Sequence, residues 1–226
     1  MTTIRLFDRI DPAPVLAAQR DRRVNFDSRE VDASWSHDRQ STVVGREAPG
    51  PPEPGGVWET ACRLVADYEM ADPEIIRAVY DPTVPLEGRD MVLEGRFLAL
   101  RFYMGVRVTS VVEEQQHGAH SWGWAYETLE GHLERGRMSY MVIKHGDSGE
   151  VEFVISAYSE HSPQLNPVLR LGWMLFGRRH QLRFYRQCGR RMVRLVHQHR
   201  NGRLAMPQRL MSDGLVLAPS DARGAG

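Results

Sequence analysis

Residues 120–144 read HSWGWAYETLEGHLERGRMSYMVIK, two alternating runs of side chains around a turn that contains glycine. Successive side chains of a strand point to opposite faces of a sheet, so this alternation gathers wide aromatic and polar side chains on one face. That face carries His120, Trp122, Trp124, Tyr126, Thr128 and Glu130. Two such runs joined by a short turn predict a β-hairpin.

Comparable runs lie on both sides of this hairpin, at residues 75–80, 90–95, 97–104, 106–114 and 151–159. The segments between the runs are rich in Gly, Asp, His and Pro, which favour turns. Parallel strands need connections of about a dozen residues or more, so connections this short disfavour a Rossmann-type sheet. The pattern predicts a meander of six or seven antiparallel strands.

Helical periodicity precedes and follows the predicted strands. Apolar residues recur at steps of three and four over residues 57–68, which predicts a short amphipathic helix. After the last run, Asn166 suits the cap and Pro167 the first position of a long helix that continues to Asn201. The apolar side of this long helix consists of Trp173, Phe176, Phe184, Cys188, Met192 and Leu195.

This order of elements predicts an α+β fold of the helix-grip type. In that architecture a curved antiparallel sheet wraps around a long C-terminal helix, and a cavity can remain between them. A closed barrel is disfavoured, because it would leave the long amphipathic helix without a surface to cover.

Both ends of the chain differ from this central part. Residues 1–56 lack sustained periodicity and finish with GREAPGPPEPGG, so we expect an extended or disordered N-terminal arm. The helix-grip domain is expected over residues 57–200, followed by a flexible tail over residues 201–226.

The composition restricts location and membrane association. No apolar run is long enough for a transmembrane helix, and charges close to the start disfavour a signal peptide. Two widely separated cysteines, Cys62 and Cys188, fall within amphipathic patterns, which indicates buried free thiols. A cytoplasmic protein is therefore expected.

A net charge of zero conceals a strong asymmetry. Residues 161–226 contain twelve Arg and two Asp, a charge of +10, which leaves −10 for residues 1–160. An arginine-rich helix of this kind is typical of a solvated face that complements an acidic sheet. It also permits contact with an acidic partner or an anionic membrane, whereas the negative remainder disfavours nucleic acid.

The hairpin is the best candidate site. A histidine near neutrality beside a carboxylate is typical of acid–base catalysis, so His132 and Glu134 are candidate catalytic groups, with Tyr126 and Thr128 as donors to a substrate oxygen. The alternative is that His132 and Glu134 only fix the turn, through backbone groups or through a neighbouring arginine.

A ligand is expected between the sheet and the long helix. Aromatic side chains on one strand face suit a small, largely apolar or polyketide-like molecule that carries a few polar groups. The alternative is that these side chains only pack the core, which is the more common role of an aromatic stripe. The candidate ligand-binding residues are Trp122, Trp124, Thr128, Tyr140, Phe176 and Gln181.

No cofactor is expected, because the chain contains no dinucleotide fingerprint, phosphate-binding glycine loop or nucleophile elbow. A catalytic metal is disfavoured as well. The pair in HGAH, His117 and His120, is accompanied by neither a cysteine pair nor a helical His-Glu-x-x-His motif.

The stretch GWAYETLEGHLERGRMSYMV, followed by VEFVISAYS and an Arg-rich helix, resembles a bacterial and plant family known as domain of unknown function nineteen-ninety. The family's Tyr-x-Thr-Leu-x-Gly-His-Pro-Glu-x-Gly pattern is matched by Tyr126, Thr128, Leu129, Gly131, His132, Glu134 and Gly136. Leu133 departs from the usual proline, Arg137 from a common acidic residue, and Tyr68 from the usual tryptophan.

The resemblance covers approximately residues 55–198. It implies a fold and a site at this hairpin. Helix-grip proteins include lipid carriers and polyketide cyclases, so the fold implies either carriage of an apolar molecule or its cofactor-independent cyclisation, dehydration or isomerisation.

Overall fold

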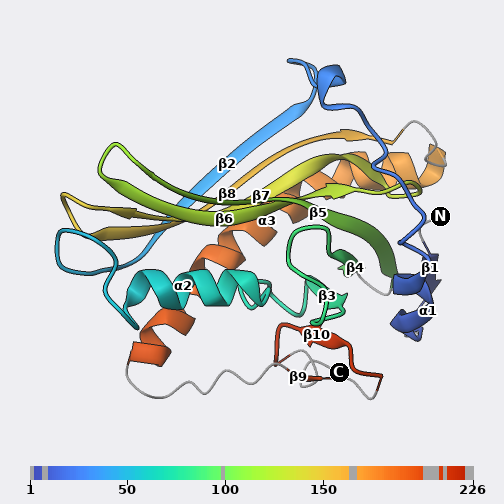
Figure 1. The fold of residues 1–226 in the computed structure, drawn as a ribbon. Helices are drawn as coiled ribbons and strands as arrows, with labels where there is room; N and C mark the ends of the chain where they lie inside the picture. Colours follow the sequence, from blue (N-terminus) through green and yellow to red (C-terminus); the bar gives the residue numbers. More distant parts are fainter. Residues whose placement is uncertain are drawn as a thin grey trace.

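The computed structural model describes residues 3–6, 10–97, 100–162, 167–200, 209–210 and 213–221. Within these residues ten strands form one sheet in the order β2-β8-β7-β6-β5-β4-β3-β10-β9, with β1 beside β5 (Figure 1). The strands are β1 (Thr3–Leu6), β2 (Ser36–Arg46), β3 (Ile76–Tyr80), β4 (Asp90–Phe97), β5 (Leu100–Gln116), β6 (Ala119–Thr128), β7 (Glu134–His145), β8 (Glu150–His161), β9 (Arg209–Leu210) and β10 (Val216–Ala218). From β3 to β8 each strand pairs antiparallel with the next, which confirms the predicted meander.

The helices are α1 (Pro12–Ala17), α2 (Val57–Ala66) and α3 (Pro167–Arg200), with a short 3-10 turn at Ser28–Glu30. The sheet arches over α3, and α2 lies beside α3 under the same face (Figure 1). A curved meander closed by a long C-terminal helix is the helix-grip arrangement, so the predicted fold class is confirmed.

Two runs that the sequence analysis separated form the single strand β5. Gly105 lies between them, and a Cβ at this position would come within 1.9 Å of the Gln19 side-chain oxygen. This glycine therefore admits the segment after α1 against the strand. The ladders shift register between Val108 and Ser110 and between Val43 and Gly45, and such bulges increase local twist and bending.

Strand β2 is an element that the sequence analysis did not predict. It pairs with β8 along almost its whole length, so this part of the expected N-terminal arm belongs to the sheet. Its sequence, SHDRQSTVVGR, is mostly polar, because an edge strand exposes much of its surface to solvent. The hydrophobic alternation that marks inner strands is consequently weak here.

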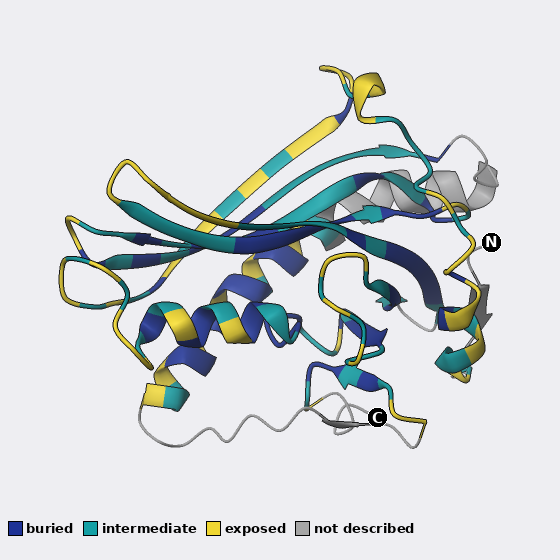
Figure 2. Ribbon diagram, in the orientation of Figure 1, coloured by how far each residue is buried: buried dark blue, intermediate teal, exposed yellow. Residues whose placement is uncertain are grey.

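The core lies between the concave face of the sheet and the two helices. Helix α2 buries Val57, Ala61, Leu64 and Val65, and α3 buries Phe184, Cys188, Met192 and Leu195 (Figure 2). These four α3 residues belong to the apolar side that the sequence predicted; the side chains of Trp173 and Phe176 lie outside the described residues.

A buried ion pair organises the proline-rich loop before α2. Lys144 lies on β7 and is 0% exposed, and its Nζ donates to Glu47 at 2.7 Å and to the carbonyls of Ala48 and Pro51. Glu47 accepts the backbone N–H of Trp58 at 2.8 Å, which supplies the N-terminus of α2 with a cap that Gly56 cannot provide. Burial opposes ionisation of Glu47, but the bonds from Lys144, Trp58 and Glu53 hold its pKa below the ordinary value.

No helix among the described residues is both long and apolar enough to span a bilayer.

Candidate functional site

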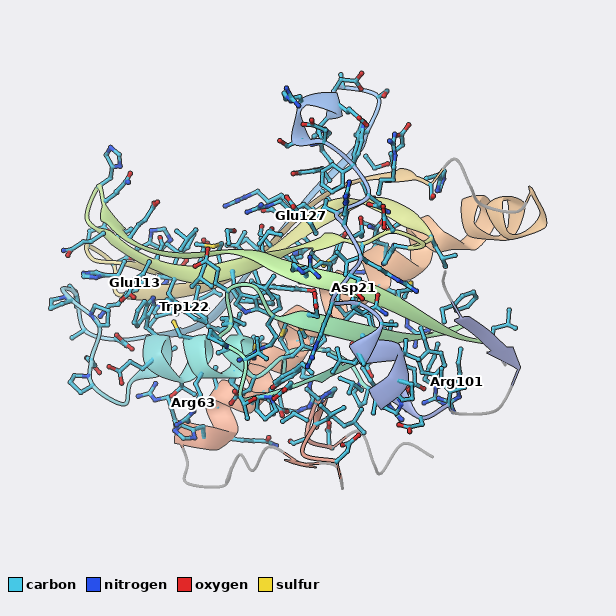
Figure 3. All side chains as sticks on the ribbon, turned by 45° about the vertical axis from the view of Figure 1, so that its right-hand side comes forward. Asp21, Arg63, Arg101, Glu113, Trp122 and Glu127 are labelled. Carbon is cyan, nitrogen blue, oxygen red and sulfur yellow. The ribbon has the colours of Figure 1, made fainter. Side chains whose placement is uncertain are left out.

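The structure divides the predicted site between two places. Trp124, Tyr126 and Tyr140 face the interior under the sheet, whereas Thr128 and His132 belong to a network at the β6–β7 turn. Figure 3 shows Trp122 on the side of the sheet that faces α2 and Glu127 on the opposite side. The alternation of side chains along β6 was therefore predicted correctly.

Tyr140 is the centre of an aromatic cluster beneath the sheet. Its ring centroid lies 5.1 Å from that of Trp124, 6.1 Å from that of Tyr126 and 6.0 Å from that of Tyr68. Trp124 is 1% exposed, and its indole N–H donates to the Val65 carbonyl of α2 at 3.1 Å. The cluster thus joins the sheet to α2, with Cys188 of α3 beside the phenols.

The hydroxyl groups of this cluster are poorly paired. Tyr140 donates to the sulfur of Met138 at 2.9 Å and Tyr126 to the same sulfur at 3.5 Å. The Tyr68 hydroxyl is buried and has no well-aligned hydrogen bond, and its nearest polar neighbour is the Tyr140 hydroxyl. A thioether is a weak acceptor, so Tyr126 and Tyr140 share one inadequate partner. Burial raises the pKa of all three phenols, which keeps them protonated and able to donate.

The backbone of Tyr68 is unusual. It adopts a φ of 59° immediately after α2, in the left-handed region that helix ends usually fill with glycine. A tyrosine at such a position costs of the order of 1 kcal/mol, which the surrounding structure must offset. This conformation ends α2 and accompanies the burial of the phenol in the core.

The cluster lies where the concave face changes from buried to half-buried side chains. The row that contains Trp124, Tyr140 and Ile155 is buried. In the next row, Met138 and Ala157 beside Tyr126 are only half-buried. Solvent therefore approaches the concave face on the side of Met138, next to the phenol groups.

His132 is held by the backbone of the turn. Its Nδ1 lies 3.0 Å from the amide nitrogen and 3.1 Å from the carbonyl oxygen of Glu134, so this ring nitrogen bonds to Glu134 in either tautomer. Burial lowers the pKa of His132 to about 4, although the bond to the Glu134 carbonyl opposes that shift. The imidazole is consequently neutral at neutral pH.

The N-terminal arm crosses the same turn. The Thr128 hydroxyl donates to the Asn25 side-chain oxygen at 2.7 Å and accepts the Gly136 amide at 2.9 Å. The Asn25 side-chain amide donates to the Glu134 carbonyl, and Val24 pairs with Leu129 as an isolated bridge. Thr128 is therefore engaged in structural bonds.

Of the remaining predicted residues, Glu134 lies close enough to Tyr126 for its negative charge to add to the effect of burial and raise the pKa of that phenol. Trp122 is half-buried against the core, and Gln181 is half-buried on α3. The Phe176 side chain lies outside the described residues. Arg135 pairs with Glu30 and Glu160, and Arg137 with Glu127, on the convex side of the sheet. The roles given to the site residues from sequence remain predictions.

Sequence reasoning missed Tyr68 and Met138 as members of the site. Met138 shares a strand face with Tyr140, so strand alternation alone places it in the cluster. The sequence placed Tyr68 at the end of an apolar helical stripe, which predicts burial but not a role in the site. Nothing in the sequence indicates its left-handed backbone conformation.

A cleft lies between α3 and the segment around Pro73. It has a volume of 390 Å³ and is lined by Asp72, Pro73, Glu74, Gln187, Arg190, Arg191, Arg194 and Asp221. Arg191 is neutralised there by the carboxylate of Asp221, with both oxygens at 2.9 Å. This cleft is polar and separate from the phenol cluster.

Comparison with known families matches residues 21–191 to the profile described as Domain of unknown function (DUF1990). The chain belongs to this family. The match begins at residue 21, so the DUF1990 domain includes β2 and the arm residues that cross the hairpin, which lie before the start of the sequence resemblance. No curated protein matches the chain.

Several solved structures are similar to this DUF1990 protein. A Thermus thermophilus protein has a TM-score of 0.46 at 7% identity, over 73% of this chain and 99% of that one. A Staphylococcus aureus protein of unknown function has a TM-score of 0.40 at 6% identity, over 75% and 99%. Ara h 8.0201 has a TM-score of 0.39 at 7% identity, over 70% and 98%.

The DUF1990 motif has a structural explanation in this chain. Gly131 adopts a φ of 86° in the turn, and a Cβ at Gly136 would come within 2.3 Å of the Tyr158 carbonyl of β8. Leu133, where the family usually has proline, is 5% exposed and packs into the core. The conformation of the turn is thus specified by the motif, and the leucine adds apolar contact.

Proposed function

We propose that this protein binds a small, largely apolar molecule between the concave face of the sheet and α3. A polar group of that molecule would accept hydrogen bonds from Tyr68, Tyr126 and Tyr140. One observation carries the proposal: three buried phenols converge, with a thioether as the acceptor for two of them and no well-aligned acceptor for the third, which lies beside the Tyr140 hydroxyl.

The energetic argument concerns unpaired donors. A buried hydroxyl without an acceptor costs about 1–3 kcal/mol. A carbonyl or hydroxyl oxygen of a ligand offers lone pairs to these donors and would recover much of that cost. The surrounding walls are aromatic and aliphatic, which favours an apolar body attached to one polar end.

The partial exposure of Met138 and Ala157 supports a route to this site. Both residues belong to the concave face. Met138 of β7 pairs in register with Tyr126 of β6, and Ala157 of β8 pairs with Met138. A ligand that inserts along this row would replace solvent against apolar side chains and reach the hydroxyl groups with its polar end.

Catalysis would be a further step at the same place. Phenols held in an enclosed site polarise a carbonyl, which suits cofactor-independent cyclisation, dehydration or isomerisation. The acid–base roles of His132 and Glu134 remain a separate hypothesis. A pKa of about 4 makes His132 a weak base at neutral pH, so the phenols are the better supported groups.

The test combines one identification with one set of variants. Native mass spectrometry of protein purified from its own host should reveal a retained small molecule. Binding of anilinonaphthalene sulfonate should then weaken about five- to tenfold for each of Tyr126→Phe and Tyr140→Phe, the effect of one hydrogen bond. Tyr158→Phe is the matched control, because its ring packs against Trp35 and Phe26 outside the concave face.

Tyr68→Phe separates ligand binding from a purely structural role. It removes the unpaired hydroxyl, so the ligand-free protein should gain about 1 kcal/mol in free energy of unfolding while ligand affinity falls. A variant that binds the probe as tightly as the parent, with no retained molecule in the native spectrum, would mean that water or nothing occupies the cluster. The proposal would then fail.

A further inference from the structure

The exposed side of α3 is unlike the rest of the molecular surface. Arg183, Arg186, Arg190 and Arg194 are all exposed and recur at steps of three and four residues. At 3.6 residues per turn they occupy one side of the helix, over a length of about 17 Å. We call these four residues the arginine ridge.

The arginine ridge lacks acidic partners. Within the described residues, none of its four members pairs with a carboxylate, whereas seven other arginines do. The sequence from His161 to Ser212 contains no acidic residue. The positive charges of the ridge therefore remain at the surface, where they can bind an external anion.

Apolar side chains border the ridge. Leu182 and Val193 are each 40% exposed, and both lie on α3. Successive helical residues are rotated by about 100°, so these two side chains and the ridge share one arc of about 120°. The apolar residues form one margin of the arc and Arg194 the other, next to Asp72 and Glu74 of the polar cleft.

We infer that this arc is a docking surface for an anionic lipid bilayer. Guanidinium groups bind phosphates in bidentate geometry, and Leu182 and Val193 are placed to enter the boundary between headgroups and acyl chains. Among the residues of α3 whose side chains are described, the apolar side faces the core and α3 packs against β2, α2 and β8, which leaves the arc free to contact the lipid.

Other occupants fit the arc less well. A second copy docked through a two-fold axis would bring two arginine ridges together, and like charges repel. Nucleic acid offers phosphates but no apolar layer for Leu182 and Val193, and residues 1–160 carry a charge of −10. A single narrow ridge is also smaller than a standard protein interface.

The test is co-sedimentation with phosphatidylcholine vesicles that contain about 30% phosphatidylserine, compared with pure phosphatidylcholine vesicles. The triple variant Arg183→Gln, Arg186→Gln, Arg190→Gln should bind the anionic vesicles about a hundredfold more weakly, at about 1 kcal/mol for each arginine. Leu182→Ser with Val193→Ser should weaken binding several-fold without changing the charge.

The matched control removes the same charge elsewhere. Arg20→Gln, Arg29→Gln and Arg39→Gln alter exposed arginines outside α3 and should leave vesicle binding within about threefold of the parent. Equal losses in both triple variants would show a non-specific effect of net charge and overturn the inference. Tighter binding of the parent to polyglutamate or to a DNA duplex than to anionic vesicles would overturn it as well.

Discussion

At the scale of single residues, alternation along β6 and β7 was sufficient to place Trp124, Tyr126 and Tyr140 in one interior cluster. Alternation could not show that Thr128 and His132 lie outside this cluster. The spacing of residues along a hairpin does not reveal which side chains are hydrogen-bonded to the backbone of the turn. The Thr128 hydroxyl and the His132 ring are both committed to bonds at the turn. Their environment depends on Asn25, about a hundred residues earlier, which no local pattern connects to the hairpin.

His132 should make the protein sensitive to acid. The pKa of His132 is about 4 in the folded chain and 6.5 ordinarily. Between these two pH values the imidazole is therefore protonated in the unfolded chain and neutral in the folded chain. Stability should therefore fall as the pH drops from about 6.5 to about 4, by up to about 3 kcal/mol. His132→Asn keeps an oxygen that can accept the Glu134 amide but does not titrate.

Chemical denaturation near pH 7 and near pH 4.5 checks this prediction. The parent protein should lose more free energy of unfolding between the two conditions than His132→Asn does. Parallel losses would show that other groups cause the acid sensitivity. The change in free energy of unfolding between the two pH values is compared, because a constant offset between the variant and the parent cancels in that difference.

At the scale of elements, the sequence predicted α2, α3 and the strands from β3 to β8, because each repeats apolar residues at its own period. Strand β2 was missed because its sequence is polar and because, in the part of the chain that the structure describes, it lies at the edge of the sheet with a strand partner on one side. The start of α2 was predicted from its apolar stripe, yet its cap was not. Glu47 caps the helix from the other side of the proline-rich loop. The one feature of the sequence related to this contact is its partner Lys144, the single lysine in a chain otherwise rich in arginine.

Helix α2 should depend on the ion pair between Glu47 and Lys144. Glu47→Gln keeps an oxygen for the Trp58 amide but leaves the Lys144 charge buried without its carboxylate, so we expect a loss of about 3 kcal/mol in free energy of unfolding. The double variant Glu47→Gln, Lys144→Met removes both charges and should recover part of that loss. A double-mutant cycle measured by denaturant unfolding gives the coupling, and additive effects would contradict the paired role.

At the scale of the whole molecule, the order of elements identified the helix-grip fold because few architectures place a meander before one long amphipathic helix. The sequence after α3 shows no sustained alternation, so the return of the chain to the sheet was not predicted. Strand β10 pairs with β3 at the side of the sheet opposite β2, and Arg191 of α3 holds Asp221 after it. Ser220 also donates to Glu69, so the return of the chain is fixed by polar contacts together with the buried side chains of Val216 and Ala218.

This arrangement gives α3 three distinct surfaces. One side packs under the sheet beside the phenols, one carries the arginine ridge, and between them Arg191 anchors the C-terminal segment. If the proposed ligand and the inferred bilayer contact both hold, the helix that covers the ligand also faces the lipid. A carrier of an apolar molecule would exchange it most directly from such a surface.

The contact between Arg191 and Asp221 should hold β10 in the sheet. Asp221→Asn replaces a bidentate charged pair with at most one neutral bond, and because the Asp221 side chain is 55% exposed the cost should be only about 1 kcal/mol. Hydrogen exchange at Val216–Ala218 should accelerate about fivefold, while the amides of β7 and β8 remain unchanged. Glu74→Gln, in the same cleft, is the control for a general change in local charge and should leave β10 protected. Uniform acceleration across the sheet would mean that Asp221 stabilises the entire fold. Unchanged exchange at β10 would mean that the pairing with β3 and the bonds from Ser220 to Glu69 retain the segment without Asp221.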